Sequence, residues 1–130
     1  MSQENVELLG RVADAYNRHD PDTYVALMDA NVEITSRFIG PASYYGHGGV
    51  RTYLQGWWEA FPDLRVEIQE VRDLGHLLLF ALRAHGHGSA SAAPFEELAW
   101  ITAKARDGKC IWWHAHAGKA QALEAAGLRE

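Results

Sequence analysis

Four histidines occur as two His-x-His pairs, His85-x-His87 and His114-x-His116. Side chains two residues apart on a strand project from the same face, an arrangement that some metal sites use. The strand expected between the two pairs, residues 95–106, would hold them ~9–10 Å apart, which is two strand spacings. Because no Asp, Glu or Cys joins them on that face, the sequence favours surface or interface histidines and predicts no metal site.

The glycine-rich stretch 46–49 is a second candidate, for phosphate binding. No Lys-Ser/Thr pair follows it, and the spacing of a dinucleotide-binding fingerprint is absent. The net charge of −5 leaves no basic stripe that could displace the counterions of a nucleic acid. We therefore expect no cofactor and no nucleic-acid partner.

Acid–base chemistry has three candidates, Glu96, Tyr16 and His114. Glu96 is expected near the rim of an internal pocket, where burial would raise the pKa of its carboxyl group. Tyr16 would then act as a hydrogen-bond donor. His114 enters the interior only if the pairing of the last two strands slips by one residue.

A hairpin at Asp107-Gly108 positions most of these groups. Asp-Gly between two apolar runs is typical of a type I′ turn, which needs positive φ at both central residues. If Arg106 pairs with Lys109, Trp100 faces Ala115 and Ile101 faces His114.

Side-chain alternation then divides this hairpin into two faces. One face carries Leu98, Trp100, Thr102, Ile111, Trp113 and Ala115, and the other carries Ala99, Ile101, Ala103, Trp112, His114 and His116. Both are too apolar to be left in water, so the sheet must be covered on both sides. We expect helices over the first face and a second subunit over the second, giving a homodimer through Trp112, His114 and His116.

Hydrophobic periodicity predicts the remaining elements. They are a helix over 2–19, a short helix opened by Asp20-Pro21, a strand at 31–38, a loop at 39–49, a helix at 50–60, strands at 64–71, 77–87, 95–106 and 109–117, and a helix at 119–126. Segregated helices and meandering strands indicate an α+β fold with helices against one face of a curved sheet. At 130 residues the chain suits one domain, 1–130.

The lone cysteine, Cys110, excludes an internal disulfide and suits a small buried hydrophobe. The longest uncharged run of note, 77–82, is far shorter than the ~20 residues of a spanning helix. The N-terminal residues lack a basic start followed by an apolar run. We expect a cytoplasmic protein with no membrane partner.

Several stretches together resemble the SnoaL-like (polyketide cyclase-like) group of the nuclear transport factor 2-like superfamily. They are Asn5-Val6, 15–20, 45–50, Phe61-Pro62-Asp63, 106–109 and 122–128. The resemblance implies a cone-shaped α+β barrel (cystatin-like), with a curved, mixed but mostly antiparallel sheet wrapped around N-terminal helices. It also implies a pocket inside the cone and commonly a dimer. That fold hosts isomerases, dehydratases, hydrolases, cyclases and non-catalytic binders, so it does not select an activity.

The functional residues of the family do not carry over. Positions matching the ketosteroid isomerase branch are Val12, Ser36 and Trp100 or Ile101, and none can serve as its tyrosine or its acids. The position matching the acid/base aspartate of SnoaL-like cyclases is Ala115, which cannot transfer a proton.

The residues predicted to line the cone are large aromatics with a few hydroxyl groups. They are Tyr16, Ser36, Trp58, Phe61, Leu98, Trp100 and Trp113. Such a lining suits a small apolar or aromatic ligand. Three functions stay open: binding of such a metabolite; an isomerase, cyclase or hydrolase using Glu96 with Tyr16, or a slipped His114; and a dimerisation module with a filled cone.

Overall fold

The computed structural model describes residues 2–37 and 42–128. Its elements are α1 (Ser2–Asn17), α2 (Pro21–Ala26), β1 (Met28–Ser36), β2 (Ala42–Tyr45), α3 (Gly46–Ala60), β3 (Arg65–Asp73), β4 (Leu78–His87), β5 (Pro94–Arg106), β6 (Lys109–His116) and α4 (Lys119–Ala125). Phe38, predicted as the end of the first strand, and residues 39–41 of the predicted loop lie outside the described residues.

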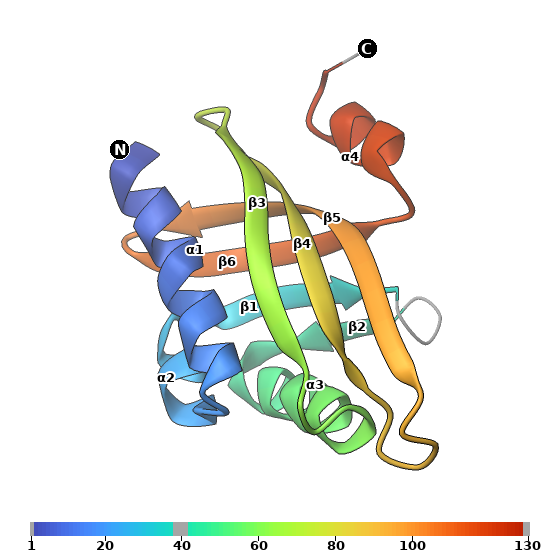
Figure 1. The fold of residues 1–130 in the computed structure, drawn as a ribbon. Coiled ribbons are helices and arrows are strands. Elements are labelled where there is room, and N and C mark those ends of the chain that lie inside the picture. Colours follow the sequence, from blue (N-terminus) through green and yellow to red (C-terminus); the bar gives the residue numbers. More distant parts are fainter. Residues whose placement is uncertain (1, 38–41, 129–130) are drawn as a thin grey trace.

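The described strands form one six-stranded sheet in the order β2-β1-β6-β5-β4-β3. The β1–β6 pair is parallel and the other neighbours are antiparallel. Figure 1 shows β5 bending sharply, so that its first part runs beside β4 and its last part beside β6. The result is the predicted α+β fold with a curved, mixed sheet, although no pairing between β2 and β3 closes the described sheet into a barrel.

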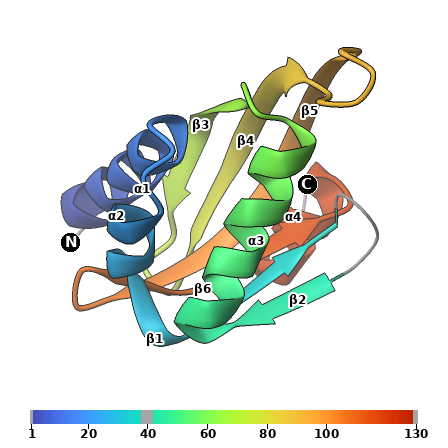
Figure 2. The same ribbon diagram turned by 90° about the horizontal axis from the view of Figure 1, so that it is seen from below.

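The helices lie on both sides of this sheet. Figures 1 and 2 show α1, α2 and α3 on the concave side, with α1 alongside β3, whereas α4 lies outside. The prediction missed β2 and began α3 at residue 50. Both follow from tertiary contacts: Glu33 to Ser36 pair with Ala42 to Tyr45, and the His47 ring is hydrogen-bonded to the Met28 carbonyl at 2.9 Å.

The predicted start of the second helix is confirmed. The Asp20 carboxylate accepts hydrogen bonds from the Thr23 backbone N–H at 3.1 Å and the Thr23 hydroxyl at 2.6 Å. Pro21 occupies the first helical position, where a missing N–H is tolerated.

The predicted hairpin register is confirmed next to the turn and wrong beyond it. Asp107 and Gly108 have φ of 55° and 76°, and Arg106 pairs with Lys109. After Ala105 and Cys110 a β-bulge shifts the pairing, so Trp100 faces His116 instead of Ala115. A bulge adds one residue to one strand and increases the local twist, which accompanies the bend of β5.

This bulge changes which β5 residues point inward. Ile101 and Ala103, predicted for the outer face, join the main core with Trp113, whose ring meets Phe80 at 5.1 Å. Trp100, predicted for the interior, packs instead in a second cluster on the convex side. The inward placement of Trp113 itself is as predicted.

The second cluster joins α4 to the convex face of the sheet. Its buried members are Leu77, Leu79, Ala122, Leu123 and Ala126, with Trp100 and Trp112 packed against them. The protein's own C-terminal helix therefore covers part of the face predicted to meet a second subunit. Among the described residues, no helix combines the length and hydropathy that a membrane crossing requires.

Candidate functional site

A cavity of about 290 Å³ lies on the concave side, between α1, α3 and the sheet. Its lining is Val12, Ala13, Tyr16, Tyr24, Ser36, Arg37, Tyr53, Trp57, Leu64, Val66, Ile68, Leu82, Ala84, Glu97, Leu98, Ala99, Ile101, Trp113, Ala115, His116 and Ala117. Most of these side chains are aliphatic or aromatic, which suits the apolar part of a small molecule.

Three tyrosines from three helices carry most of the polar groups of the inner wall. Tyr16 comes from α1, Tyr24 from α2 and Tyr53 from α3. Burial raises the pKa of Tyr16 and Tyr24 above the ordinary value, and neighbouring tyrosines add to the effect. Burial also raises the pKa of Tyr53 to about 12, opposed by a hydrogen bond with Trp57. All three hydroxyls therefore keep their protons at neutral pH and can donate hydrogen bonds.

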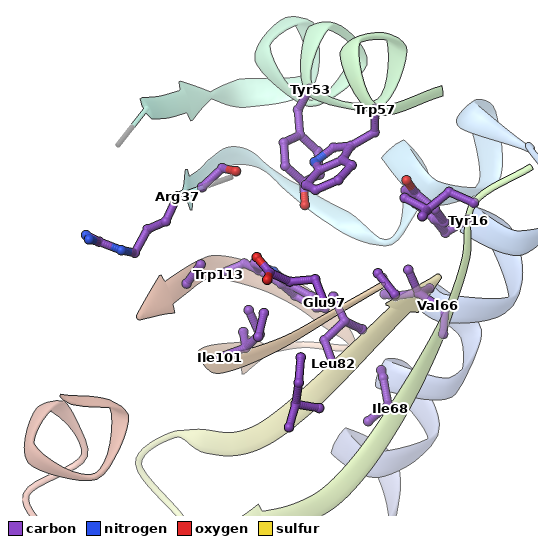
Figure 3. Close-up of a pocket in the computed structure, with 18 of the residues that line it drawn as sticks. Tyr16, Arg37, Tyr53, Trp57, Val66, Ile68, Leu82, Glu97, Ile101 and Trp113 are labelled. Atoms are coloured by element: carbon purple, nitrogen blue, oxygen red, sulfur yellow. The ribbon is translucent and has the colours of Figure 1, made fainter. Parts of the chain in front are cut away.

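Tyr16 and Tyr24 have unused hydrogen-bonding capacity. Their rings contact each other at 6.3 Å, and neither hydroxyl has a hydrogen-bond partner among residues 2–37 and 42–128. Both line the cavity, and Figure 3 shows the Tyr16 hydroxyl on the side of α3 and Trp57. Neither hydroxyl is among the fully buried polar atoms without a partner, so both face the cavity space and can donate to the acceptor atom of a molecule bound there.

The two charged side chains of the cavity lining, Arg37 and Glu97, lie at the solvent-exposed part of the cavity. Glu97 and Arg37 are exposed lining residues, so they mark where the cavity meets solvent. In Figure 3 the Glu97 carboxylate points toward the side on which Tyr53 and Trp57 lie, whereas the Arg37 guanidinium points away from the aromatic rings. The site thus combines neutral donors inside with one carboxylate at its mouth.

Four of the seven residues predicted to line the interior do so: Tyr16, Ser36, Leu98 and Trp113. Trp58 instead stacks on His19, with ring centroids 4.6 Å apart and planes at 17°. Phe61 stacks on Phe95 at 4.3 Å, beyond the end of α3, and Trp100 lies on the convex side.

Glu96, the predicted acid–base residue, does not lie on the cavity face. It is paired in register with His85, and its side chain, 60% exposed, forms an ion pair with Arg83. The bulge explains this, because shifting β5 by one residue turns Glu96 outward and Glu97 inward.

His114 also lies on the convex side, stacked on Trp112 at 4.5 Å. Its Nε2 is 3.7 Å from Glu33 Oε1 and has no hydrogen-bond partner in the described chain. The sequence left open a slip of one residue in the pairing of β5 and β6. The slip is present, but it turns the side chains of β5 to the opposite face and leaves those of β6 as predicted. Ala115, at the position matching the cyclase aspartate, lines the cavity.

The second His-x-His pair is divided between two environments. His116 Nε2 and Thr102 Oγ1 are 2.7 Å apart, and burial, His114 and Arg37 lower the pKa of His116. On β4, His87 binds Asp63 through both Nδ1 and its backbone N–H, which lowers the pKa of Asp63. Within residues 2–37 and 42–128 no three potential ligands gather in a way that could hold a metal ion.

Among the lining residues that sequence reasoning missed are Tyr24, Tyr53, Trp57 and Glu97. Tyr53 and Trp57 are four apart and therefore share one helix face, but Leu54 and Trp58 are adjacent on the same broad apolar side of α3, so the sequence did not show which of these residues face the cavity. Glu97 could have been found only by anticipating the bulge.

Solved structures of similar fold cover nearly the whole chain. A ketosteroid isomerase-like protein from Catenulispora acidiphila, in complex with trimethylamine, has a TM-score of 0.78 at 17% identity over 94% of this chain and 93% of its own. A proposed SnoaL-like polyketide cyclase from Jannaschia has a TM-score of 0.74 at 17% identity, over 88% of this chain and 85% of its own. IdmH, a proposed polyketide cyclase from Streptomyces antibioticus, has a TM-score of 0.72 at 19% identity, over 95% of this chain and 98% of its own. At these identities the likeness concerns the fold.

Sequence comparison gives a closer assignment. No protein with a curated description matches the chain. The model of the SnoaL-like domain family matches residues 9–119, which include every helix and strand except the first part of α1 and most of α4. The chain belongs to the SnoaL-like domain family.

Proposed function

We propose that the protein binds a small apolar or aromatic metabolite that carries a carbonyl or similar acceptor oxygen. The observation that carries this proposal is the pair of Tyr16 and Tyr24 hydroxyls, which line an apolar cavity without partners in the described chain. The aromatic rings of the lining would pack against the flat body of the ligand. The neutral hydroxyls would then donate to its oxygen.

Two probes of nearly equal shape test this proposal. 2-Acetylnaphthalene carries a carbonyl oxygen where 2-isopropenylnaphthalene carries a methylene group. A cavity without donors would favour the hydrocarbon, because the carbonyl loses its water on binding. We expect titration calorimetry to show tighter binding of the ketone.

Tyr16→Phe should lower this ketone preference about fivefold, the worth of one neutral hydrogen bond. Tyr45→Phe, at an exposed tyrosine outside the cavity lining, is the matched control and should change nothing. A preference for the hydrocarbon that Tyr16→Phe leaves unaltered would contradict the proposal. Failure of both probes to bind would favour a filled cone that serves dimerisation alone.

Catalysis is a second candidate, favoured by the position of Glu97 in the same lining as Tyr16. A ketone whose oxygen accepts a hydrogen bond from a tyrosine could lose a proton from the adjacent carbon to the Glu97 carboxylate, giving an enol or enolate. This is the proton-transfer step that isomerisation and aldol-type cyclisation share. It replaces Glu96 by Glu97 in the acid–base role expected from the sequence.

Deuterium exchange into the acetyl group of 2-acetylnaphthalene measures this step directly. In D₂O the protein should accelerate loss of the methyl proton signal, and Glu97→Gln should abolish the acceleration. Glu96→Gln is the control, because Glu96 pairs with Arg83 outside the cavity. Equal exchange in both variants would exclude Glu97 as the base.

We also propose that a second copy of the chain covers the convex face beside α4, around His114 and His116. Support comes from His114 Nε2, which is buried without a hydrogen-bond partner in the described chain. Light scattering should give twice the chain mass at pH 8. Protonation of His116, whose pKa is lowered by burial, should weaken the dimer as the pH falls toward 5. The mass of a single chain at pH 8 would exclude the interface.

A further inference from the structure

We propose that Asn17 is a positioning residue for the cavity, which holds the Tyr16 hydroxyl in place by fixing the end of α1 to the free edge of β3. The inference rests on the proposed function, because it concerns the orientation of Tyr16 toward a bound acceptor. The contact in question is the seam between α1 and β3, where a helix and not a further strand lies against the edge of the sheet.

This seam exists because β3 is the last strand of the described sheet. On its far side β3 meets a helix instead of another strand, and Figures 1 and 2 show α1 running alongside it. Both elements contribute to the cavity wall: α1 through Val12 and Tyr16, β3 through Val66 and Ile68. The relative position of α1 and β3 therefore sets the shape of the cavity on this side.

Asn17 joins these two elements by a double hydrogen bond. Its Nδ2 donates to the Val66 carbonyl at 2.9 Å, and its Oδ1 accepts from the Val66 N–H at 2.8 Å. Val66 lies opposite Ala84 of β4 in the strand register. Its backbone N–H and C=O both point away from β4, toward α1, where Asn17 binds them. The amide side chain thus makes the contacts that a neighbouring strand would make.

These two hydrogen bonds act next to the residue whose hydroxyl must be positioned, Tyr16. Asn17 is the last residue of α1, directly after Tyr16, and Val66 presents its side chain to the cavity. The Asp14, Ala15 and Tyr16 carbonyls of this last turn accept hydrogen bonds from the backbone N–H groups that follow the helix, and Asn17 adds the link from this turn to the sheet. A hydrogen bond from a hydroxyl needs its acceptor within a few tenths of an ångström and a narrow range of angles, so loosening this turn would weaken the Tyr16 contact.

The chain supplies a matched control at the opposite end of the same helix. Asn5 Nδ2 contacts Asp73 Oδ2 at 3.4 Å, so Asn5 also links α1 to β3. Neither Asn5 nor Asp73 lines the cavity. A role limited to holding α1 on the sheet would make Asn5→Ala and Asn17→Ala alike in their effect on binding.

The experiment measures the preference for 2-acetylnaphthalene over 2-isopropenylnaphthalene in each variant. We expect Asn17→Ala to lower this preference about as much as Tyr16→Phe does, roughly fivefold, and Asn5→Ala to leave it unchanged. Combining Asn17→Ala with Tyr16→Phe should give little further loss, because both remove the same contact. An unchanged preference in Asn17→Ala would overturn the inference.

Asn17→Asp tests the same point if Asn17→Ala does not fold. Its ionised carboxylate has no proton for the Val66 carbonyl, whereas the protonated acid can donate to that oxygen and accept from the N–H as the amide does. The ketone preference of Asn17→Asp should therefore be low at pH 7, where an ordinary aspartate with a pKa of about 3.9 is ionised. A ketone preference equal to that of the wild type would count against the inference. A wild-type protein without any ketone preference would overturn the proposed function as well, whereas a preference that survives both Asn17 variants would overturn this inference alone.

Discussion

The concave and convex faces of the sheet differ in the kind of polar group they hold. The concave face has neutral tyrosine hydroxyls in an apolar cavity, with Glu97 and Arg37 at its mouth. The convex face has His85, His87 and His114 and the exposed Arg83–Glu96 ion pair, and α4 covers part of this face. His116 is among the residues that line the cavity. Residue types that commonly do chemistry thus gather on the convex face, whereas tyrosine hydroxyls without hydrogen-bond partners in the described chain line the cavity.

This contrast shows that residue type alone is a poor guide to the site. A histidine or glutamate on an exposed face exchanges protons with water and needs no ligand. A tyrosine hydroxyl without a protein partner in an apolar cavity can donate to a ligand, and the low local dielectric strengthens that hydrogen bond. The three predictions below test the contrast in order of decreasing effect.

The largest effect is expected from truncating one tryptophan on each face. Trp113 is 4% exposed and packs against Phe80, so Trp113→Ala should lower the free energy of unfolding by about 3–5 kcal/mol. Trp112 is only partly buried, against α4 and His114, so Trp112→Ala should cost less than half as much. Urea denaturation measures both, and equal losses would mean that the faces do not differ in packing.

A smaller effect is expected from acidification. The pKa of His116 is lowered in the folded protein, first by burial and then by His114 and Arg37. The unfolded chain therefore takes up this proton at higher pH than the folded one, and stability is complete above about pH 6.5 and falls below it. His116→Gln should lose less stability than the wild type between pH 7 and pH 5. Urea titrations at both pH values measure the loss, and an equal loss in the variant and the wild type would contradict this assignment.

The smallest effect is expected from the exposed ion pair. Arg83 and Glu96 are 48% and 60% exposed, and such pairs contribute about 0.2–1 kcal/mol. A double-mutant cycle with Arg83→Gln and Glu96→Gln should give a coupling in this range that vanishes in 1 M salt. A larger coupling that persists in salt would show that the convex face is less open to solvent than we describe.

Local signals predicted much of this fold. The Asp20-Pro21 start of α2, the Asp107-Gly108 turn and the periods of most helices and strands depend on neighbours in sequence, and the structure has them. The missed strand β2 depends on pairing with β1, which no local pattern reveals. The site was partly predicted, because the sequence placed Tyr16 and Trp113 inside. The adjacent residues Trp57 and Trp58 both lie on the broad apolar side of α3, and the sequence did not show that Trp57 is the one that faces the cavity.

The sequence by itself determined the α+β class, the order of most elements and the resemblance to the SnoaL-like family. Only the tertiary structure decided which of two adjacent acids, Glu96 or Glu97, reaches the cavity. The reason is that strand side chains alternate with a period of two, so one extra residue in β6 reverses the inward set of β5. That bulge accompanies the bending of β5 between β4 and β6, a requirement of the curved sheet as a whole.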